Sequence, residues 1–325
     1  MSLLRRLEGH SAAVTAVSTK GDLGATASRD RSLKVWRLST GALERSIETE
    51  GSLLCCSLSS TRVAAGGIGK RAQVWELETG KKVLSLEHDG WVRGVIIDEE
   101  DGFAMTCSDD KTAKIWKQSE VALILSKHLE AVLCVCIIEK GKWYATGSED
   151  STVRVFSGDG KLARVFRGHD RAVVSLASAG KTLLMSGSDD KITKWWDLET
   201  KKCVFDTECA ARVDALAVSP FGTLLVAAGE VWSIPEQKRL LNLPHQNTKA
   251  CAFFELTGTG NTEDDGDLCV ILAIHGPDFR PILLRLKGCR ESIIPAIPAD
   301  YHPETPELIT DESPVFPDDP QPNHL

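Results

Sequence analysis

Histidine, aspartate and hydroxyl side chains, the groups that perform acid–base and nucleophilic chemistry, recur at fixed spacing along this chain. Four aspartates each lie six residues before a large aromatic residue, with a threonine or serine four residues before the aspartate and a histidine further upstream. The four sets are His10, Thr26, Asp30 and Trp36; His88, Thr106, Asp110 and Trp116; His128, Thr146, Asp150 and Phe156; and His169, Ser186, Asp190 and Trp196. Because no nucleophile–base pair or metal set stands apart from these repeats, we do not expect a catalytic site.

The aromatic residues mark a repeat of about forty residues. Trp36, Trp75, Trp116, Phe156 and Trp196 are separated by 39, 41, 40 and 40 positions. A fixed period of this length is typical of repeat architectures, in which each unit buries its apolar face against the next. Short apolar alternations predict strands, and no ten-residue helical pattern separates them. Four strands fit one period, so each repeat predicts a four-stranded antiparallel blade of a β-propeller.

Within one blade, the polar set can form a single chain of hydrogen bonds. An aspartate in a tight turn, a histidine in the preceding loop, a hydroxyl on a middle strand and the closing tryptophan are complementary donors and acceptors. Removing one member would leave the others unpaired at a cost of roughly 1–3 kcal/mol. We therefore predict that these histidines and aspartates stabilise the blades, and we weigh this against a catalytic role.

These motifs resemble the WD-repeat (WD40) β-propeller family, whose blades carry Gly-His near the start and Trp-Asp at the end. The fifth repeat matches best, with Gly168-His169, Asp190 and Trp196-Asp197. The second repeat lacks both the histidine and the aspartate, since Gly69 occupies the aspartate position, and the repeat that ends near Trp232 has also lost its turn aspartate. The resemblance is therefore strongest through Asp197.

The resemblance implies an all-β propeller of seven blades over residues 1–288. Segments 249–256, 268–275 and 281–286 predict three strands of the last blade, with a charged insertion at 257–267 between the first two. Residues 2–7 predict the fourth strand, which would pair in the last blade and leave no open edge. Six blades are the alternative if the last segment packs differently.

The family often binds partners on the top face of the ring, through residues before each turn aspartate and around the start of each inner strand. Transferred by position, the resemblance implies a partner-binding set on this face. Its members are Arg29, Trp91, Arg93, Asp109, Glu149, Asp189, Arg212 and Asp214, with Ala13, Thr15, Ser52, Leu54, Leu133 and Val174 beside them.

Trp91 and Arg93 stand out in this set, because Trp and Arg dominate binding hot spots. The alternative is that Trp91 packs between blades. The acids Asp109, Glu149 and Asp189 would form an arc suited to peptides that carry Arg or Lys, although a solvated rim has the same composition.

Composition narrows the classes of protein that the chain can belong to. Its 325 residues are 42% apolar, enough for a large core, and no apolar run approaches the length of a membrane span or a signal-peptide core. The ten cysteines show no CxxC pair, which indicates reduced thiols of a cytoplasmic or nuclear protein without a metal or other cofactor. The net charge is −8 and the sequence shows no stripe of basic residues, so nucleic-acid binding is disfavoured. We expect a monomeric propeller.

Residues 289–325 form a separate acidic segment. They contain eight acids, one base and eight of the thirteen prolines, which predicts disorder. Thr305-Pro306 and Ser313-Pro314 are candidate sites of proline-directed phosphorylation. A docking motif and a merely solubilising tail are both open interpretations.

The favoured function is a non-catalytic scaffold or recognition module that binds protein partners within a larger complex. A substrate-recognition subunit of a ubiquitin ligase is the alternative. There is no room for an F-box before Gly9, and the fifth repeat ends Trp196-Asp197-Leu198-Glu199 instead of Trp-Asp-x-Arg, which argues against that role. An enzyme with a site in the channel is less favoured, although propellers do host catalysis.

Overall fold

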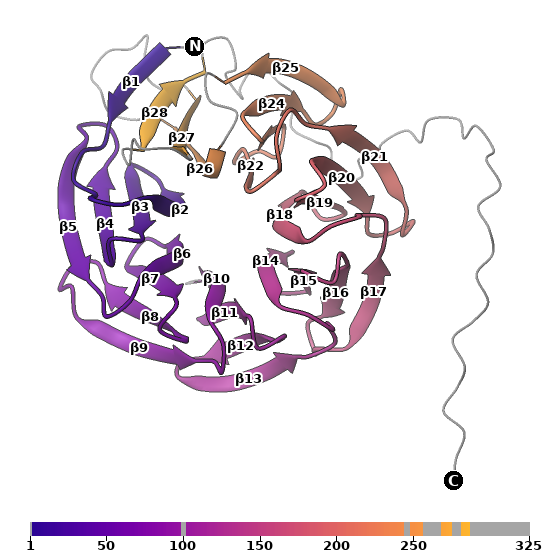
Figure 1. Ribbon diagram of the computed structural model, residues 1–325, viewed down its shortest axis with the longest axis horizontal. Coiled ribbons are helices and arrows are strands. Elements are labelled where there is room, and N and C mark those ends of the chain that lie inside the picture. The colour runs from indigo at the N-terminus through magenta and orange to yellow at the C-terminus, as the bar shows by residue number, and fades with distance from the viewer. Residues whose placement is uncertain (1, 99–101, 244–247, 256–267, 275–280, 287–325) are drawn as a thin grey trace.

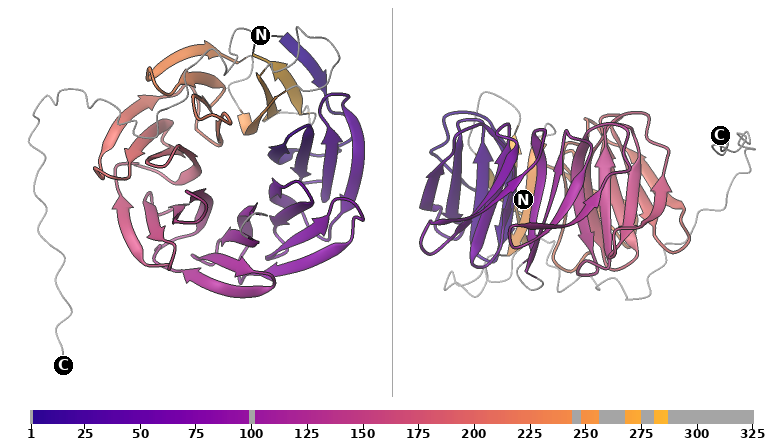
Figure 2. Two further views of the ribbon diagram at one scale, coloured as in Figure 1. Left: turned by 180° about the vertical axis from the view of Figure 1, so that it is seen from behind. Right: turned by 90° about the horizontal axis from the view of Figure 1, so that it is seen from below.

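The computed structural model describes residues 2–98, 102–243, 248–255, 268–274 and 281–286, and within these segments the regular elements are all β-strands. The strands form seven four-stranded antiparallel sheets, arranged radially around a central channel (Figure 1). The edge-on view shows the sheets standing upright around the ring (Figure 2). The predicted all-β propeller of seven blades is confirmed.

The first three blades use consecutive strands. Blade 1 contains β2 (Val14–Lys20), β3 (Leu23–Ser28), β4 (Ser32–Arg37) and β5 (Ala42–Glu48). Blade 2 contains β6 (Leu53–Leu58), β7 (Arg62–Gly67), β8 (Arg71–Glu76) and β9 (Lys82–Glu87). Blade 3 contains β10 (Val92–Asp98), β11 (Phe103–Ser108), β12 (Ala113–Lys117) and β13 (Glu120–Leu125).

The next three blades follow the same order. Blade 4 contains β14 (Val132–Ile138), β15 (Trp143–Ser148), β16 (Val153–Ser157) and β17 (Leu162–Phe166). Blade 5 contains β18 (Val173–Ala179), β19 (Leu183–Ser188), β20 (Ile192–Asp197) and β21 (Cys203–Glu208). Blade 6 contains β22 (Leu216–Val218), β23 (Leu224–Ala227), β24 (Glu230–Ser233) and β25 (Lys238–Asn242).

Blade 7 joins the two ends of the ring. Its strands are β26 (Thr248–Glu255), β27 (Leu268–Ile274), β28 (Ile282–Arg285) and, on the outside, β1 (Ser2–Arg6). β1 pairs with β28 in antiparallel register, so the predicted closure by the N-terminal strand is confirmed. The predicted insertion at 257–267 and the tail from residue 289 lie outside the described residues, so the expected boundary between propeller and tail stays a prediction.

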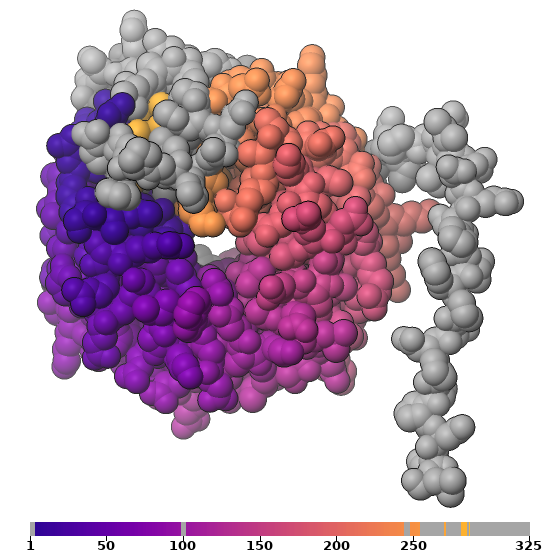
Figure 3. Space-filling view, viewed as in Figure 1, coloured from indigo at the N-terminus to yellow at the C-terminus, as the bar shows by residue number. Residues whose placement is uncertain are grey.

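The core lies between blades. Each of seven apolar interfaces takes residues from two neighbouring sheets; between blades 1 and 2, for example, Val35 packs with Leu53, Val63 and Trp75. The middle strands are buried on both faces, and all six residues of β11 are buried. Near-continuous runs of apolar and small residues therefore mark the inner strands, whereas the outer strands alternate between exposed and covered positions. The space-filling view shows an opening at the centre of the ring (Figure 3).

The outer strands carry a recurrent irregularity. In blades 1 to 6 the register between the third and fourth strands shifts at the closing aromatic residue, as it does between Val35 and Trp36. A β-bulge at this position bends the free edge and discourages pairing with another chain.

Candidate partner-binding face

In blades 1, 3, 4 and 5 the recurrent polar residues form one chain of hydrogen bonds, which we call the staple. In blade 1, His10 Nδ1 lies 2.8 Å from Asp30 Oδ2, and His10 Nε2 lies 2.8 Å from Thr26 Oγ1. Trp36 Nε1 donates to the same hydroxyl at 2.8 Å. A single tautomer satisfies every contact: indole N–H to hydroxyl, hydroxyl to Nε2, and Nδ1–H to carboxylate.

The other staples repeat this geometry. The histidine–aspartate distances are 2.7 Å for His88–Asp110, 2.9 Å for His128–Asp150 and 2.8 Å for His169–Asp190. Each histidine also contacts its hydroxyl at 2.7 Å, and these hydroxyls belong to Thr106, Thr146 and Ser186. Trp116 and Trp196 close two of the chains, whereas Phe156 ends blade 4 without a donor.

Burial sets the charge of the staples. It lowers the pKa of His10, His128 and His169, and the attraction of the paired aspartate does not fully offset this effect. Burial opposes ionisation of Asp30 as well, but hydrogen bonds from Ser32, Ser11 and His10 outweigh it and lower the pKa of that carboxyl to about 2. At neutral pH the staples of blades 1, 4 and 5 therefore each hold a neutral imidazole bound to a carboxylate.

Blades 2 and 6 do without the staple. At the hydroxyl position blade 2 has Ala65, which pairs with Gln73 as Thr26 pairs with Lys34. A cavity of about 30 Å³ remains beside Gly69. In blade 6 the indole nitrogen of Trp232 has no hydrogen-bond partner.

The staple turns lie on one side of the ring, which we call the top face. There the guanidinium of Arg93 binds the carboxylate of Asp109 through two hydrogen bonds of 2.6 and 2.9 Å. Trp91 lies beside it, with Arg93 Cζ 5.2 Å from the indole centroid. Trp91 is 45% exposed, so it does not pack between blades. The structure thus brings three of the predicted residues together as a rigid, partly apolar projection.

A second cluster lies across blades 5 to 7. Arg212 contacts Asp189 at 3.2 Å and Asp214 at 2.6 Å, and Lys249 reaches Asp214 at 3.1 Å. Lys249 was not among the predicted residues. In the predicted arc of acids, Asp109 and Asp189 are each paired with an arginine of this chain, and the fit of the arc to basic peptides stays a prediction.

The remaining two predicted residues stand apart. Arg29 and Glu149 are exposed and occupy equivalent turns of blades 1 and 4, where their backbone N–H groups bond to Ala13 and Ala131. Neither residue belongs to the two clusters.

Bulges mark the start of the innermost strands. The register with the second strand shifts by one residue in six of the described blades, so one extra residue stands at the top-face end of each inner strand. Bulges of this kind redirect a side chain next to a functional surface. The extra residues are Thr15, Leu54, Arg93, Leu133, Val174 and Lys249.

Two apolar residues of this face were missed by the sequence analysis. Leu129 is 71% exposed and directly follows His128, at a position held by Ser11, Asp89 and Asp170 in the other stapled blades. Ile68 is 40% exposed and occupies the turn position at which Asp109 stands in blade 3. Aligning the repeats with one another would have revealed both, because an apolar residue then stands out against the polar residues at the equivalent position of the other blades.

Trp91 also differs from the residues at the equivalent positions of the other blades. The backbone carbonyls of Ala13, Ser52, Trp91, Ala131 and Ala172 accept equivalent bonds from the following turns, so these five residues correspond. Four of the five are small. Ile68, Trp91 and Leu129 therefore form an apolar sector across the adjacent blades 2, 3 and 4.

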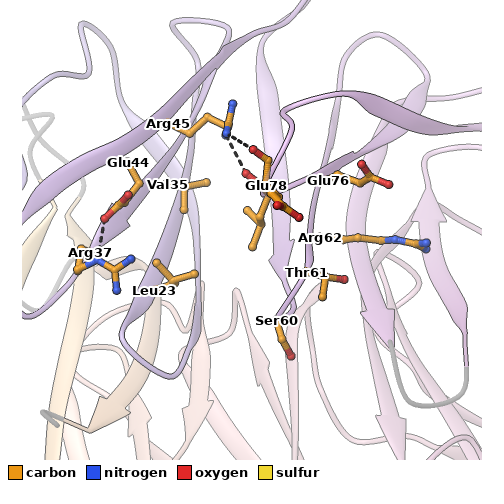
Figure 4. A pocket seen from close by; sticks show the side chains of 11 residues that line it. Leu23, Val35, Arg37, Glu44, Arg45, Ser60, Thr61, Arg62, Glu76 and Glu78 are labelled. Atoms are coloured by element: carbon orange, nitrogen blue, oxygen red, sulfur yellow. Dashed lines mark hydrogen bonds and ion pairs between the residues drawn. The ribbon is translucent and has the colours of Figure 1, made fainter. Parts of the chain in front are cut away.

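The opposite side of the ring, the bottom face, carries two grooves of about 530 and 720 Å³ on either side of blade 2. In the first, Arg37 and Glu44 form an ion pair, and Arg45 donates to the backbone carbonyls of Leu77 and Glu78 (Figure 4). The ion pair lies within blade 1, whereas the bonds of Arg45 join blade 1 to blade 2. Among the described residues, no group of three or more His, Cys, Asp or Glu side chains is placed to hold a metal ion. The described part of the chain contains no helix long and apolar enough to cross a membrane.

The radial blades and their staples define the chain as a β-propeller. The sequence profile of the WD domain, G-beta repeat family matches residues 1–37, 80–117, 119–157 and 160–197, the segments that contain the four staples. The chain is a WD40-repeat propeller, as its motifs predicted.

The chain is similar in sequence to several curated proteins at low identity. Nuclear distribution protein nudF of Aspergillus niger is 27% identical over 60% of this chain and 42% of its own length. DENN domain and WD repeat-containing protein SCD1 of Arabidopsis thaliana is 29% identical over 58% of this chain and 16% of its length. Pre-mRNA-processing factor 17 of Homo sapiens is 24% identical over 61% and 38%. The chain spans less than half the length of these three relatives.

Proposed function

We propose that this chain is a non-catalytic scaffold that binds a partner protein or peptide on its top face. WD40 relatives are consistent with a protein-interaction scaffold. The observation that carries the proposal is Trp91, a large aromatic side chain that is 45% exposed and held in place by an arginine which is itself bound to Asp109. An ordered tryptophan loses little conformational freedom on binding, which suits a hot spot.

The surroundings of Trp91 support an apolar anchor. Ile68 and Leu129 lie on the flanking blades, and the charges of Arg93 and Asp109 neutralise each other. A partner residue placed here would bury apolar surface without leaving a charge unpaired. This favours an apolar anchor over the basic peptide expected from the acids alone.

The site of action and the complex are part of the same proposal. The names of the relatives refer to nuclear distribution and to pre-mRNA processing, which supports action in the cytoplasm or nucleus within a larger complex. The monomeric state, the ubiquitin-ligase alternative and phosphorylation at Thr305 and Ser313 stay predictions, and the last two residues lie outside the described part of the chain.

A comparison of partner recovery tests the proposal. The tagged full-length chain is incubated in native extract, and bound proteins are measured by quantitative mass spectrometry. We expect the Trp91→Ala/Arg93→Ala double variant and Leu129→Ser to lower recovery of the main partners at least fivefold. Ile124→Ser, which changes an outer-strand residue that is 56% exposed, is the matched control and should recover them normally. Normal recovery by both top-face variants would show that this face is not the binding surface.

A further inference from the structure

The bottom-face end of blade 5 presents three lysines without an ion-pair partner among the described residues. Lys181 lies in the turn between β18 and β19, and Lys201 and Lys202 lie in the loop between β20 and β21; all three are exposed. The backbone N–H of Leu198 donates to Thr182 O at 2.8 Å, which joins the two loops. The three ammonium groups therefore belong to one surface, which we call the blade 5 lysine surface.

The lysines of these two loops outnumber the exposed carboxylates three to one, because Glu199 is the one exposed acid in residues 180–182 and 198–202. Asp197 is 3% exposed, and its Oδ1 accepts hydrogen bonds from the backbone N–H groups of Glu199 and Thr200 at 2.7 and 3.1 Å. Its charge is thus engaged in closing the loop. In blade 4, by contrast, Lys142 pairs with Glu139 and Lys161 pairs with Asp159.

The chain carries the complementary charge itself. The third strand of each blade runs from the top face to the bottom face, and β28 does the same: Pro281 O accepts a bond from Leu7 N near the top, and the strand ends at Arg285. The sequence continues for 40 residues beyond Arg285, and residues 289–325 hold eight acids against one base. β28 therefore ends on the face where the lysines lie, and the acidic segment follows it in the sequence.

The acidic segment is long enough to reach the blade 5 lysine surface, and its tether makes weak contacts sufficient to hold it there. Twenty extended residues span about 65 Å, whereas a compact body of this size has a radius of gyration of about 19 Å. Tethering raises the effective concentration of a segment to about the millimolar range. Weak, screened ion pairs are then enough to hold it.

We propose that the acidic, proline-rich segment 289–325 docks in cis on the blade 5 lysine surface. Phe221 provides an apolar contact on the way, since it is 58% exposed in the turn of blade 6, between the exit of β28 and blade 5. The segment offers Tyr301 and Phe316 among its acids for this contact. Docking on the bottom face leaves the top face free for a partner.

Zero-length cross-linking tests this proposal on the full-length chain. A carbodiimide joins carboxylates to lysines that they touch, and mass spectrometry identifies the joined residues in the monomeric fraction. Blade 2 supplies the matched control, because its loop also contains Glu-Thr followed by two lysines, Lys81 and Lys82. We expect links from acids of 300–319 to Lys181, Lys201 or Lys202 to exceed those to Lys81 and Lys82 at least fivefold, and 1 M salt to remove the excess.

Three results would overturn the proposal. Equal linking to both blades would indicate random encounters, and absence of links to blade 5 would exclude docking there. Links between isotopically light and heavy copies would show that the segment binds another molecule.

Native digestion by a glutamate-specific protease provides a second measurement that does not depend on lysine reactivity. Lys201→Ser/Lys202→Ser should speed cleavage within 304–312 about threefold, whereas Lys81→Ser/Lys82→Ser should not change it. Equal rates in the wild type and both variants would also contradict docking.

Discussion

Adjacent aspartates in one turn have different tasks in this protein. Asp110 accepts hydrogen bonds from His88 and Thr112 and so stabilises its own blade, whereas the next residue back, Asp109, binds Arg93 on the surface. The difference arises from the direction of the side chains: that of Asp110 faces the blade interior, and that of Asp109 faces the top face. Residue type does not separate structural from binding roles here.

Replacing Asp190 by alanine should destabilise the protein. Its carboxylate accepts bonds from His169 and from the backbone N–H groups of Ile192 and Asp170, and all three donors would lose their partner. We expect the free energy of unfolding to fall by about 2–4 kcal/mol, measured by urea denaturation. Asp170→Ala removes a nearby exposed acid and should change it by less than about 0.5 kcal/mol; equal effects would disprove the staple role of Asp190.

The staples should also make stability depend on pH. The pKa values of His10, His128 and His169 are lowered in the folded state, so protonation favours the unfolded chain as the pH falls below about 6.5. The pKa of Asp150 is about 2, because hydrogen bonds from Thr152, His128 and Leu129 outweigh burial. Its contribution is present above about pH 4 and lost as the pH falls towards 2.

Urea unfolding at pH 7.5, 5.5 and 3.5 would measure this dependence. The denaturation midpoint should fall between the first two values and again towards the third. A constant midpoint from pH 7.5 to 5.5 would show that the histidines do not titrate with folding.

At the scale of the blade, the sheets are variations on one plan, and blade 6 departs furthest from it. Its turn between β23 and β24 contains two residues, Ala228 and Gly229, both with positive φ angles. The shorter hairpin places Glu230 opposite Ala227 and two residues before the closing Trp232, at the register position that Lys34, Gln73, Lys114, Arg154 and Lys194 occupy in blades 1 to 5. A buried carboxylate thus stands where four of the other blades have a lysine or an arginine.

Replacing Glu230 by leucine should therefore stabilise the protein. The residue is 2% exposed, and its Oε2 has no hydrogen-bond partner. Arg239, which contacts Oε1 at 3.2 Å, is half exposed and can return to water. We expect the free energy of unfolding to rise by about 1–2 kcal/mol, with Glu236→Leu, an exposed substitution, as the neutral control; a loss of stability would show that the ion pair matters more than burial.

The ring as a whole depends on one seam. Leu7, Trp36 and Leu38 pack with Leu283 where blade 1 meets blade 7, and β1 supplies the last strand of that blade. All other blades are built from consecutive segments, so the seam is the interface that needs the two distant parts of the chain to meet. In the closed ring, β1 covers the edge of β28, and this outer strand is the exposed edge of the last sheet.

Deleting residues 2–6 should open the seam. β28 would lose its antiparallel partner and present unpaired N–H and C=O groups, which favours association with other chains. We expect the melting temperature to fall by at least 10 °C and larger species to appear in size-exclusion chromatography. Deleting residues 321–325 controls for the shorter chain. A monomer of unchanged stability would show that β1 does not close the ring.

The repeat in the sequence determined the architecture. A forty-residue period, short alternating runs and the recurrent His, Ser or Thr, Asp and Trp were enough to predict radial four-stranded sheets, because these features depend on local pairing and on stacking of like units. The resemblance to WD-repeat propellers added the number of blades and the closure by the N-terminal strand. Lys249, Ile68 and Leu129 were not predicted, nor were the arginine partners of Asp109 and Asp189. Which side chains meet across blades is decided by the curvature of the ring and by the bulges at the start of six inner strands. Such contacts join Asp189 to Arg212 and Asp214 to Lys249, which are 23 and 35 positions apart, and no local spacing encodes them.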